Sequence, residues 1–288
     1  MTEKLRLPDV TICAADSAFV DLTVRALMRS MDLCAFGDAI LFSDVARAGP
    51  FRHVPIAPLR SIADYSRFVL RDLVDHVTTS HILVVQWDGY VVDPAAWKRA
   101  FLKYDYIGSV WLDQPEHLSV GNGGFSLRSR RLMQTVRQLP HLAGYNEDVV
   151  IGRTYRAIME RDNGIRFAPS KIAGLFAHEY KIEAGVPTFG FHGVENLSRY
   201  TTDDELTDIC KALDMARLHP EKMLILAATC SGDGHPKAAE VVYRGLRKLR
   251  SPIIIHRVLV DQLGHVAGDQ VFHNLEAMVG AEPRPLAT

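Results

Sequence analysis

A carboxylate stands at the carboxyl end of an apolar segment in the first half of the chain. The five residues His81–Val85 read HILVV, which is typical of a strand buried on both faces. Gln86, Trp87, Asp88 and Gly89 follow, so polarity begins abruptly where the strand ends. Open α/β sheets bind ligands at the carboxyl ends of their strands, and hard divalent cations prefer carboxylate oxygen. Asp88 is therefore a candidate cation ligand, and a turn cap before Gly89 is the alternative.

A glycine-rich segment, VGNGGFSLRSRRLM, covers Val120–Met133. Gly121, Gly123 and Gly124 allow the backbone to turn tightly and to approach a ligand closely. The pattern fits neither a GxxxxGK[ST] phosphate loop nor a GxGxxG dinucleotide motif, so the sequence does not favour those two classes of site. An alternating strand pattern follows the glycines, and Ser129 begins a predicted helix.

Two adjacent acids, Glu147 and Asp148, precede an apolar helical pattern. Asn146 is placed to cap this helix, and acids in a first turn stabilise the helix dipole, which gives both acids a purely structural explanation. The same position lowers the pKa of a carboxylate and weakens it as a base. The pattern ends at Asn163-Gly164, which fits a left-handed cap. Later, His192 lies in TFGFHG and is either a structural histidine or a metal ligand.

The elements that must position these residues alternate between strands and helices. Before the strand at His81, the pattern predicts strands at Val10–Ala15, Ala39–Phe42 and His53–Ile56, and helices at 18–30 and Tyr65–His76. This order predicts an α/β fold whose sheet is mixed and mostly parallel, flanked by helices. A late strand is expected at Ile165–Pro169.

The character of the chain changes beyond Arg199, where helical patterns follow one another. They cover Asp203–Leu218, Pro220–Thr229, Pro236–Arg250 and Val266–Val279. The sequence therefore predicts a main domain at residues 1–200 and a small helical carboxyl-terminal extension at 201–288. These helices are candidates for homo-oligomer formation or for docking a partner.

Composition narrows the class of protein. The 33 basic and 34 acidic residues nearly balance, so nothing indicates a nucleic-acid or anionic-membrane partner. The four cysteines lie far apart without CxxC pairs, which argues against a zinc site and favours buried thiols in a reducing compartment. MTEKLRLPDV lacks an apolar signal core, and no apolar run approaches membrane-spanning length, so we expect no transmembrane segment and a cytoplasmic location.

Six segments, taken in order, carry a resemblance to a known family. They are TTSHILVVQWDGYVVDPAAW, FLKYDYIGSVW, VGNGGFSLRSRRL, NEDVVIGRTYR, GIRFAP and TFGFHG, and the resemblance covers about Val10–Val194. This series resembles a bacterial family known chiefly as a domain of unknown function, regarded as glycosyltransferase-like and linked to surface polysaccharide genes. WDG looks like a one-carboxylate form of the DxD motif of A-fold glycosyltransferases. EDVVIG is similar to the EDVxxG motif of inverting β-1,3-glycosyltransferases, and GNGGFSLR to their acceptor-side segment. The resemblance implies a GT-A-like nucleotide-diphospho-sugar transferase fold.

The resemblance also implies roles for the polar residues. Asp88 would bind Mn²⁺ or Mg²⁺, and His192 would be a further ligand to the ion. The chain departs from a full DxD motif because position 86 is Gln, which leaves the metal requirement open. Asp148 would be the base that deprotonates the acceptor sugar, and Glu147 would form a hydrogen bond with that sugar. These two roles can be exchanged between the two acids.

Donor and acceptor contacts follow from the same resemblance. The nucleotide-sugar donor would contact Ala14, Asp16, Tyr65, Arg67, Gln86, Trp87, Asp88 and Gly89. The acceptor would contact Asn122, Gly123, Gly124 and Tyr145, and Arg128 and Arg130 are additional candidates for phosphate contact. Asp16 has an alternative role as a helix cap, and Trp87 as a packing residue.

The sequence thus predicts an enzyme, a hexosyltransferase-like glycosyltransferase of polysaccharide or lipopolysaccharide assembly. It would move a sugar from a nucleotide donor to a glycan hydroxyl, with inversion the favoured outcome and retention the alternative. Two other functions stay open: a non-catalytic nucleotide-sugar or glycan-binding domain, and a nucleotide-sugar hydrolase. The donor sugar, the acceptor and the linkage depend on pocket shape, which no motif here encodes.

Overall fold

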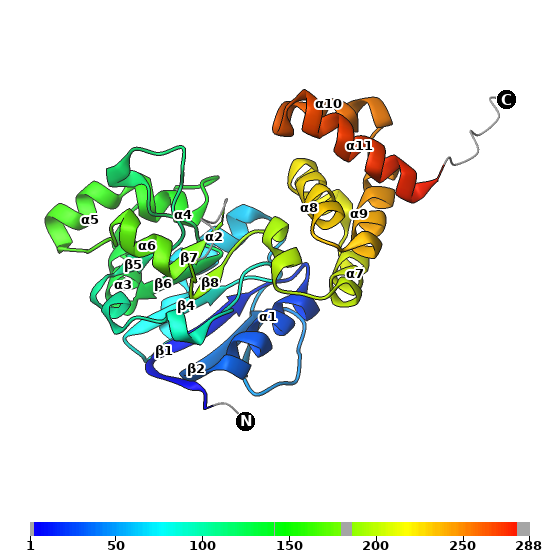
Figure 1. Ribbon diagram of the computed structural model, residues 1–288. Coiled ribbons are helices and arrows are strands. Elements are labelled where there is room, and N and C mark those ends of the chain that lie inside the picture. The colour runs from blue at the N-terminus through cyan, green and yellow to red at the C-terminus, as the bar shows by residue number, and fades with distance from the viewer. Residues whose placement is uncertain (1–2, 141, 180–185, 281–288) are drawn as a thin grey trace. The chain divides into compact units, whose positions relative to one another are not determined.

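The computed structural model describes residues 3–140, 142–179 and 186–280 (Figure 1). The chain divides into two compact units, Met1–Gly193 and Val194–Thr288. The division falls a few residues before the boundary at residue 200 that the sequence predicted.

The first unit is built on a six-stranded sheet with the strand order β3-β2-β1-β4-β6-β5. The strands are β1 (Leu5–Ala15), β2 (Cys34–Ser43), β3 (Arg52–Pro55), β4 (His81–Val85), β5 (Tyr106–Ile107) and β6 (Phe125–Ser129). The pairs β3–β2, β2–β1 and β1–β4 are parallel, whereas β6 runs antiparallel to both β4 and β5. All five residues of β4 are buried, as the apolar run predicted. The predicted mixed, mostly parallel α/β fold is confirmed.

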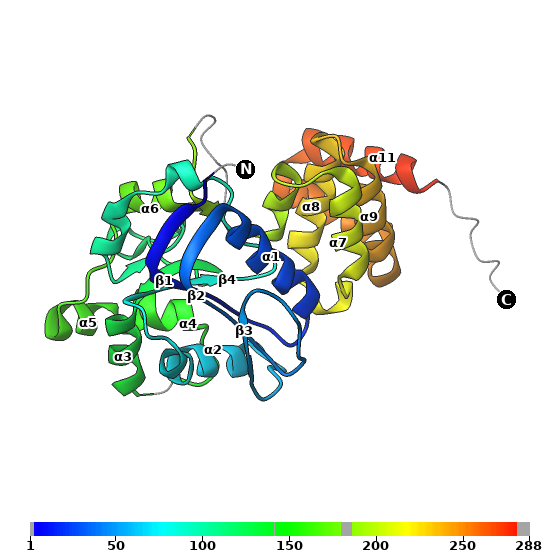
Figure 2. The same ribbon diagram turned by 90° about the horizontal axis from the view of Figure 1, so that it is seen from below.

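Helices cover both faces of this sheet because the chain changes direction along it. From β1 through α1 (Val20–Leu33) the chain moves outward to β2, whereas from β3 through α2 (Ile62–Arg71) it returns to β4 on the other side of β1. Right-handed crossovers in opposite directions place their helices on opposite faces. Figure 2 shows α1 on one side of the strands and α2 with α3 (Arg130–Gln138) on the other. The strand order therefore reverses between β1 and β4, which is where such folds bind ligands.

Hydroxyl, carboxylate and glycine residues mark the ends of these helices. The Ser61 hydroxyl accepts the Asp64 N–H at the start of α2, and the Ser129 hydroxyl accepts the Leu132 N–H at the start of α3. Asp16 accepts the N–H groups of the two residues just before α1. Gly164, with φ of 61°, is the left-handed cap of α5 (Arg156–Asn163). Side-chain caps of this kind satisfy N–H groups that the helix leaves unpaired.

The remaining elements of the first unit are short. They are the 3₁₀ helices Leu73–His76, Pro94–Ala96, Arg99–Lys103 and Glu116–Leu118, the helices α4 (Glu147–Val149) and α6 (Ser170–Phe176), and the paired strands β7 (Ala177–His178) and β8 (Gly190–Phe191). A π-helical turn, Val150–Thr154, joins α4 to α5. The strand predicted at Ile165–Pro169 is wrong, because this segment makes a single bridge from Phe167 to Tyr106 beside the sheet.

The second unit is helical, as the sequence predicted. Its elements are the 3₁₀ helices Val194–Arg199 and Met215–Arg217 and the helices α7 (Asp203–Ala212), α8 (Pro220–Gly232), α9 (Pro236–Leu249), α10 (Pro252–Leu263) and α11 (His265–Val279). The sequence patterns missed α10, where Ile255 and Leu259 are buried but Ile253 and Ile254 are exposed, so the apolar residues do not mark one face. Within the described ranges, no helix has the length and apolar character needed to cross a membrane. All four cysteines are buried free thiols.

Candidate functional site

Three segments of the first unit meet at one edge of the sheet. Val84 of β4 lies opposite Cys13 of the parallel strand β1, so the residues after both strands leave at the same edge. Val85 lies opposite Phe125, the first residue of the antiparallel strand β6, so the glycine-rich segment before Phe125 reaches this edge too. The topology therefore brings Ala14–Asp16, Gln86–Gly89 and Asn122–Gly124 to the switch point of the sheet.

Asp88 lies in a tight turn immediately after β4. The Gly89 N–H donates to the Gln86 carbonyl at 3.0 Å, and the Asp88 carbonyl accepts the Gly193 N–H at 3.0 Å. The side chain of Asp88 is buried in this edge, with 9% of the residue exposed. Trp87 is half-buried and packs on Phe19 with ring centroids 5.6 Å apart, which fits the packing role.

His192 lies between two carboxylates. Its Nε2 is 3.5 Å from Asp88 Oδ1 and 3.2 Å from Gln86 Oε1, and its Nδ1 is 3.4 Å from Glu179 Oε1. Burial acts to lower the pKa of His192, but the two carboxylates outweigh burial and raise it to about 10. The structure thus brings together Asp88 and His192, which the sequence predicted as metal ligands, and adds Glu179, which the sequence analysis missed.

The glycine-rich turn contacts this histidine directly. Asn122 has a φ of 62°, a left-handed conformation that asparagine adopts more readily than most residues. Its Oδ1 accepts the N–H groups of Gly124 and Phe125, which leaves Nδ2 to face His192 Nδ1 at 2.9 Å. A Cβ on Gly124 would lie 2.1 Å from His192 Nε2 and 2.7 Å from Gln86 Oε1. The predicted acceptor-side residues therefore form one wall of the Asp88–His192 site.

The two acids of α4 lie on the other side of the same turn. Asp148 Oδ2 accepts the Gly123 N–H at 3.1 Å, and Asp148 Oδ1 accepts the Val149 N–H at 2.7 Å. Glu147 is 4% exposed, and its Oε1 accepts a hydrogen bond of 2.8 Å from Arg128 Nη2. The helix begins after Asn146 as predicted, although the Asn146 side chain makes no capping bond.

The pKa of Asp148 is raised to about 6. Burial is the largest cause and the negative charge of Glu147 is the next. The N–H groups of Val149 and Gly123 and the charge of Arg128 lower the pKa but do not offset these effects. The expectation that a first-turn position would lower this pKa is therefore wrong for Asp148. A carboxylate whose pKa lies near neutrality is better suited to accept a proton.

Arg128 lies in the interior of the first unit, whereas the sequence suggested that it contacts a phosphate. Its guanidinium is fully buried, donating from Nε to Ser126 Oγ at 2.9 Å and from Nη2 to the Gly123 carbonyl at 3.1 Å and to Glu147. A phosphate in solvent cannot reach this group, so the phosphate-contact prediction for Arg128 is wrong. The alternation of side chains along a strand could have predicted that Arg128 is buried, because position 128 lies on the same face of β6 as the buried Ser126.

Tyr65 joins the site, whereas Arg67 lies away from it. The Tyr65 hydroxyl is buried, and burial and the charge of Glu147 raise its pKa. No hydrogen bond of standard geometry reaches the hydroxyl within the described residues, although the Gln86 side chain lies close enough to lower that pKa. Arg67, two positions further along α2, is exposed, pairs with Asp72 at 3.3 Å and lines a separate hollow. Tyr145 is 54% exposed.

Residues at the end of β1 lie at the correct edge but are engaged elsewhere. Asp16 Oδ1 accepts the N–H groups of Ala18 and Phe19, and Oδ2 accepts the Thr23 hydroxyl at 2.7 Å. Asp16 therefore fixes the turn that leads into α1, although the N-cap residue itself, Phe19, has no side-chain cap bond. Ala14 is buried in the sheet, with 1% exposure. A ligand at this end of β1 would meet the backbone and small side chains.

The donor atoms around Asp88 fit a cation in part. The 3.5 Å between Asp88 Oδ1 and His192 Nε2 is a separation that two ligands of one ion can have, and oxygen and imidazole nitrogen suit Mn²⁺. Within residues 3–140, 142–179 and 186–280, no three His, Cys, Asp or Glu side chains are arranged to hold a metal ion. Asp88 and His192 would therefore be two protein ligands that need oxygen atoms from a bound molecule or water to complete the shell.

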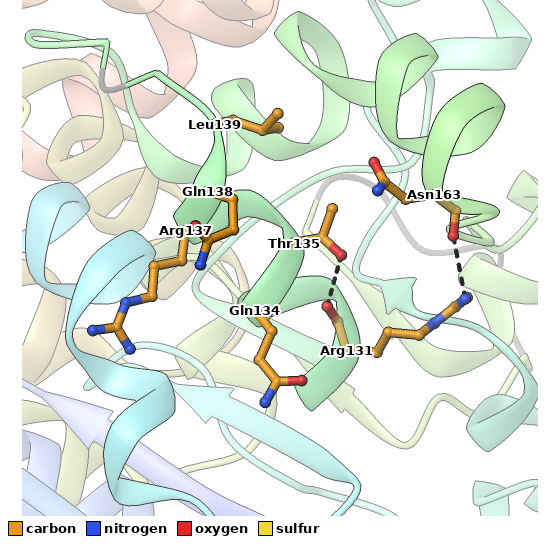
Figure 3. Close-up of a pocket in the computed structure, with 7 residues that line it drawn as sticks. All are labelled: Arg131, Gln134, Thr135, Arg137, Gln138, Leu139 and Asn163. Carbon is orange, nitrogen blue, oxygen red and sulfur yellow. Dashed lines mark hydrogen bonds between the residues drawn. The ribbon is translucent and has the colours of Figure 1, made fainter.

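A surface hollow of about 570 Å³ lies away from this site, along α3 and the end of α5 (Figure 3). Its lining includes Arg131, which donates to the Asn163 carbonyl at 3.3 Å and pairs with Asp105 at 2.6 Å. Arg137 in the same lining pairs with Asp75. Because both cations already have carboxylate partners, the hollow offers no unbalanced charge for a ligand, and we do not assign the chemistry to it.

The comparisons with known proteins cover the segment that holds most of the site. Residues 50–192 match the profile of a family described as "Protein of unknown function (DUF5672)". This match includes every site residue from Tyr65 to His192 and leaves out α1, the whole of β1 and β2 and the whole second unit. No curated protein matches the chain. About half of the chain is therefore similar to this family.

Proposed function

We propose that this chain is a glycosyltransferase of the GT-A type, which moves a sugar from a nucleotide-sugar donor to a hydroxyl of a glycan. The observation that carries the proposal is the position of the Asn122–Gly124 turn between two sets of groups. On one side lie Asp88 and His192 at 3.5 Å, and on the other side lies Asp148, bonded to Gly123. A transfer of this kind needs both a site for a diphosphate and a base for the acceptor.

Asp148 supplies the base. Its carboxylate takes the proton of the acceptor hydroxyl while that oxygen forms a bond to the anomeric carbon of the donor sugar. The bond between this carbon and the diphosphate oxygen breaks, and the nucleoside diphosphate leaves with the electron pair. Attack from the face opposite the leaving group inverts the anomeric carbon. The raised pKa of Asp148, about 6, supports the assignment because a base works best near the operating pH.

Asp88 and His192 would hold the diphosphate side of the donor. A bound Mn²⁺ or Mg²⁺ ion, when present, stabilises the negative charge of the leaving group. Asp88 Oδ1 and His192 Nε2 are the atoms that would contact the ion. Gln86 in place of a second acid leaves the site with one carboxylate at the turn.

The fold and the resemblance support the same proposal. A single mixed sheet with its polar residues at the β1/β4 switch point is what an A-type glycosyltransferase fold implies. We extend the proposal to assembly of polysaccharide or lipopolysaccharide in the cytoplasm, which rests on the resemblance of the six segments. Two further functions are outcomes of the test: a domain that binds nucleotide sugars without turnover, and a hydrolase of nucleotide sugars.

The testing experiment measures binding and turnover in one set of variants. Thermal unfolding is followed with UDP-, GDP-, CMP- and dTDP-sugars, with and without Mn²⁺. A ligand at a hundred times its Kd stabilises the folded state by about 2.7 kcal/mol. We expect a shift with one nucleotide, weakened by Asp88→Ala and unchanged by Asp162→Asn, a matched exposed carboxylate on α5. Absence of any shift in folded protein contradicts the proposal.

Turnover separates the three functions. A glycosyltransferase releases nucleoside diphosphate in proportion to a glycan acceptor and loses this release in Asp148→Asn. A hydrolase releases free sugar at the same rate whether or not acceptor is present. A binding domain shows the thermal shift without any release, and Asp148→Asn leaves its affinity unchanged.

A further inference from the structure

Glu147, Asp148, Gly123 and Arg128 form a closed ring of contacts. The Gly123 N–H donates to Asp148 Oδ2 at 3.1 Å, and the Gly123 carbonyl accepts Arg128 Nη2 at 3.1 Å. The same Nη2 donates to Glu147 Oε1 at 2.8 Å, and Glu147 is the neighbour of Asp148 in the chain. One glycine is therefore held by the two consecutive acids, directly by Asp148 and through Arg128 by Glu147.

The two ion-paired members of the ring, Arg128 and Glu147, are buried, which is a costly place for charge. Arg128 is 0% exposed, and its Nη1 is buried with no hydrogen-bond partner among the described residues. A buried ion pair contributes little stability compared with apolar side chains of similar volume, because both ions lose their hydration. A gain in stability therefore does not explain why the chain buries this ion pair. The pair does hold the groups that it contacts in defined positions, and this explains its burial.

The backbone of the turn is shaped to admit the pair. A Cβ at position 123 would lie 2.0 Å from Glu147 Oε1 and 3.0 Å from Arg128 Nη2, so only glycine lets the carboxylate approach the turn this closely. Glu147 is also held from the opposite side, because its N–H donates to Ser66 Oγ of α2 at 3.1 Å. Both the side chain and the backbone of Glu147 are therefore fixed by the protein, and its carboxylate faces Arg128.

We propose that Arg128 and Glu147 are positioning residues that hold the Asp148 carboxylate against the Asn122–Gly124 turn, and that Glu147 does not bind the acceptor. This replaces the acceptor-bonding role that the sequence gave to Glu147. The inference rests on the proposed function for its catalytic meaning, but the contact ring itself is independent of the reaction.

The charges of the ring act on Asp148 in opposite directions. The negative charge of Glu147 raises the pKa of Asp148, and the positive charge of Arg128 lowers it. Neutralising Glu147 therefore moves the pKa of Asp148 from about 6 toward its ordinary value of 3.8.

The test is a titration of Asp148 by carboxyl ¹³C NMR, with Asp148→Asn used to assign its resonance. Glu147→Gln keeps the shape of the side chain and an oxygen that can accept from Arg128, so the fold is retained. We expect the Asp148 titration to move to lower pH in this variant. Asp105→Asn is the matched control, because it removes a buried acid from an ion pair with Arg131 outside the ring. An unchanged titration in Glu147→Gln, or an equal shift in Asp105→Asn, overturns the inference.

Kinetics give a second, separable result. If transferase activity is found, Glu147→Gln moves the acid limb of the kcat/KM profile to lower pH and leaves the acceptor KM within about twofold, since uniform substrate binding is intact. A tenfold rise of the acceptor KM with an unmoved limb returns Glu147 to acceptor binding and overturns the inference. If no activity is found, the proposed function fails, while the NMR titration still decides the role of the ring.

Discussion

The substitution Gly124→Ala tests whether the site has the geometry described. The new Cβ would lie 2.1 Å from His192 Nε2, whereas an ordinary van der Waals contact begins at about 3.4 Å, so the ring must move by more than 1 Å. His192 bonds to Asn122 at 2.9 Å and to Gln86 at 3.2 Å, and a movement of this size takes one or both beyond hydrogen-bond range. Overpacking of a buried position costs about 1–3 kcal/mol, to which the lost bonds add about 1 kcal/mol each.

The expected result is a loss of about 2–5 kcal/mol in the free energy of unfolding, measured by urea denaturation. The nucleotide-dependent thermal shift should also fall, because His192 no longer lies beside Asp88. Gly174→Ala in α6 is the matched control, since nothing lies within 4 Å of the added methyl group. In that helix alanine is favoured over glycine, so the control should gain about 0.4–1 kcal/mol. Gly124→Ala with wild-type stability and an unchanged thermal shift would refute the placement of Gly124 against His192.

Three further predictions concern the charged groups of the site. Arg128→Gln should lose about 3–5 kcal/mol of unfolding free energy in urea denaturation, because it leaves the Glu147 carboxylate buried and unpaired. The double variant with Glu147→Gln should regain part of this loss. A double variant no more stable than Arg128→Gln would contradict the pairing. The pKa of Asp148 is raised from 3.8 to about 6 in the folded state, so its contribution to stability is complete below pH 3.8 and is lost as pH rises through 6. Asp148→Asn should therefore flatten the curve of unfolding free energy against pH in this window. A curve parallel to that of the wild type would count against the raised pKa. The pKa of His192 is raised from 6.5 to about 10, so its contribution to stability is complete below pH 6.5 and disappears as pH rises through 10. His192→Gln should therefore lose less stability than the wild type between these two pH values. An equal loss would show that the carboxylates do not hold the proton.

The sequence by itself determined the elements and the edge of the sheet that carries the chemistry. The buried run His81–Val85 predicted β4, and the polar residues after it predicted a site at the end of that strand. These signals are local, because burial on both faces and helix capping depend on residues within a few positions of one another. The brief pairing of Phe167 with Tyr106 was misread as a strand, and α10 was missed because its apolar residues do not share a face.

Only the tertiary structure decided which polar residues act together and in what state of charge. His192 and Glu179 reach Asp88 through β8 and β7, and no spacing in the sequence indicates this meeting. Arg128 looked like a phosphate ligand, but strand β6 places it in the interior, where it pairs with Glu147. For Asp148 the local helix position indicated a lowered pKa, whereas burial and a neighbouring charge raise it. Desolvation and charge–charge interaction depend on everything packed around a group, so they become known only when distant segments of the chain are brought into contact.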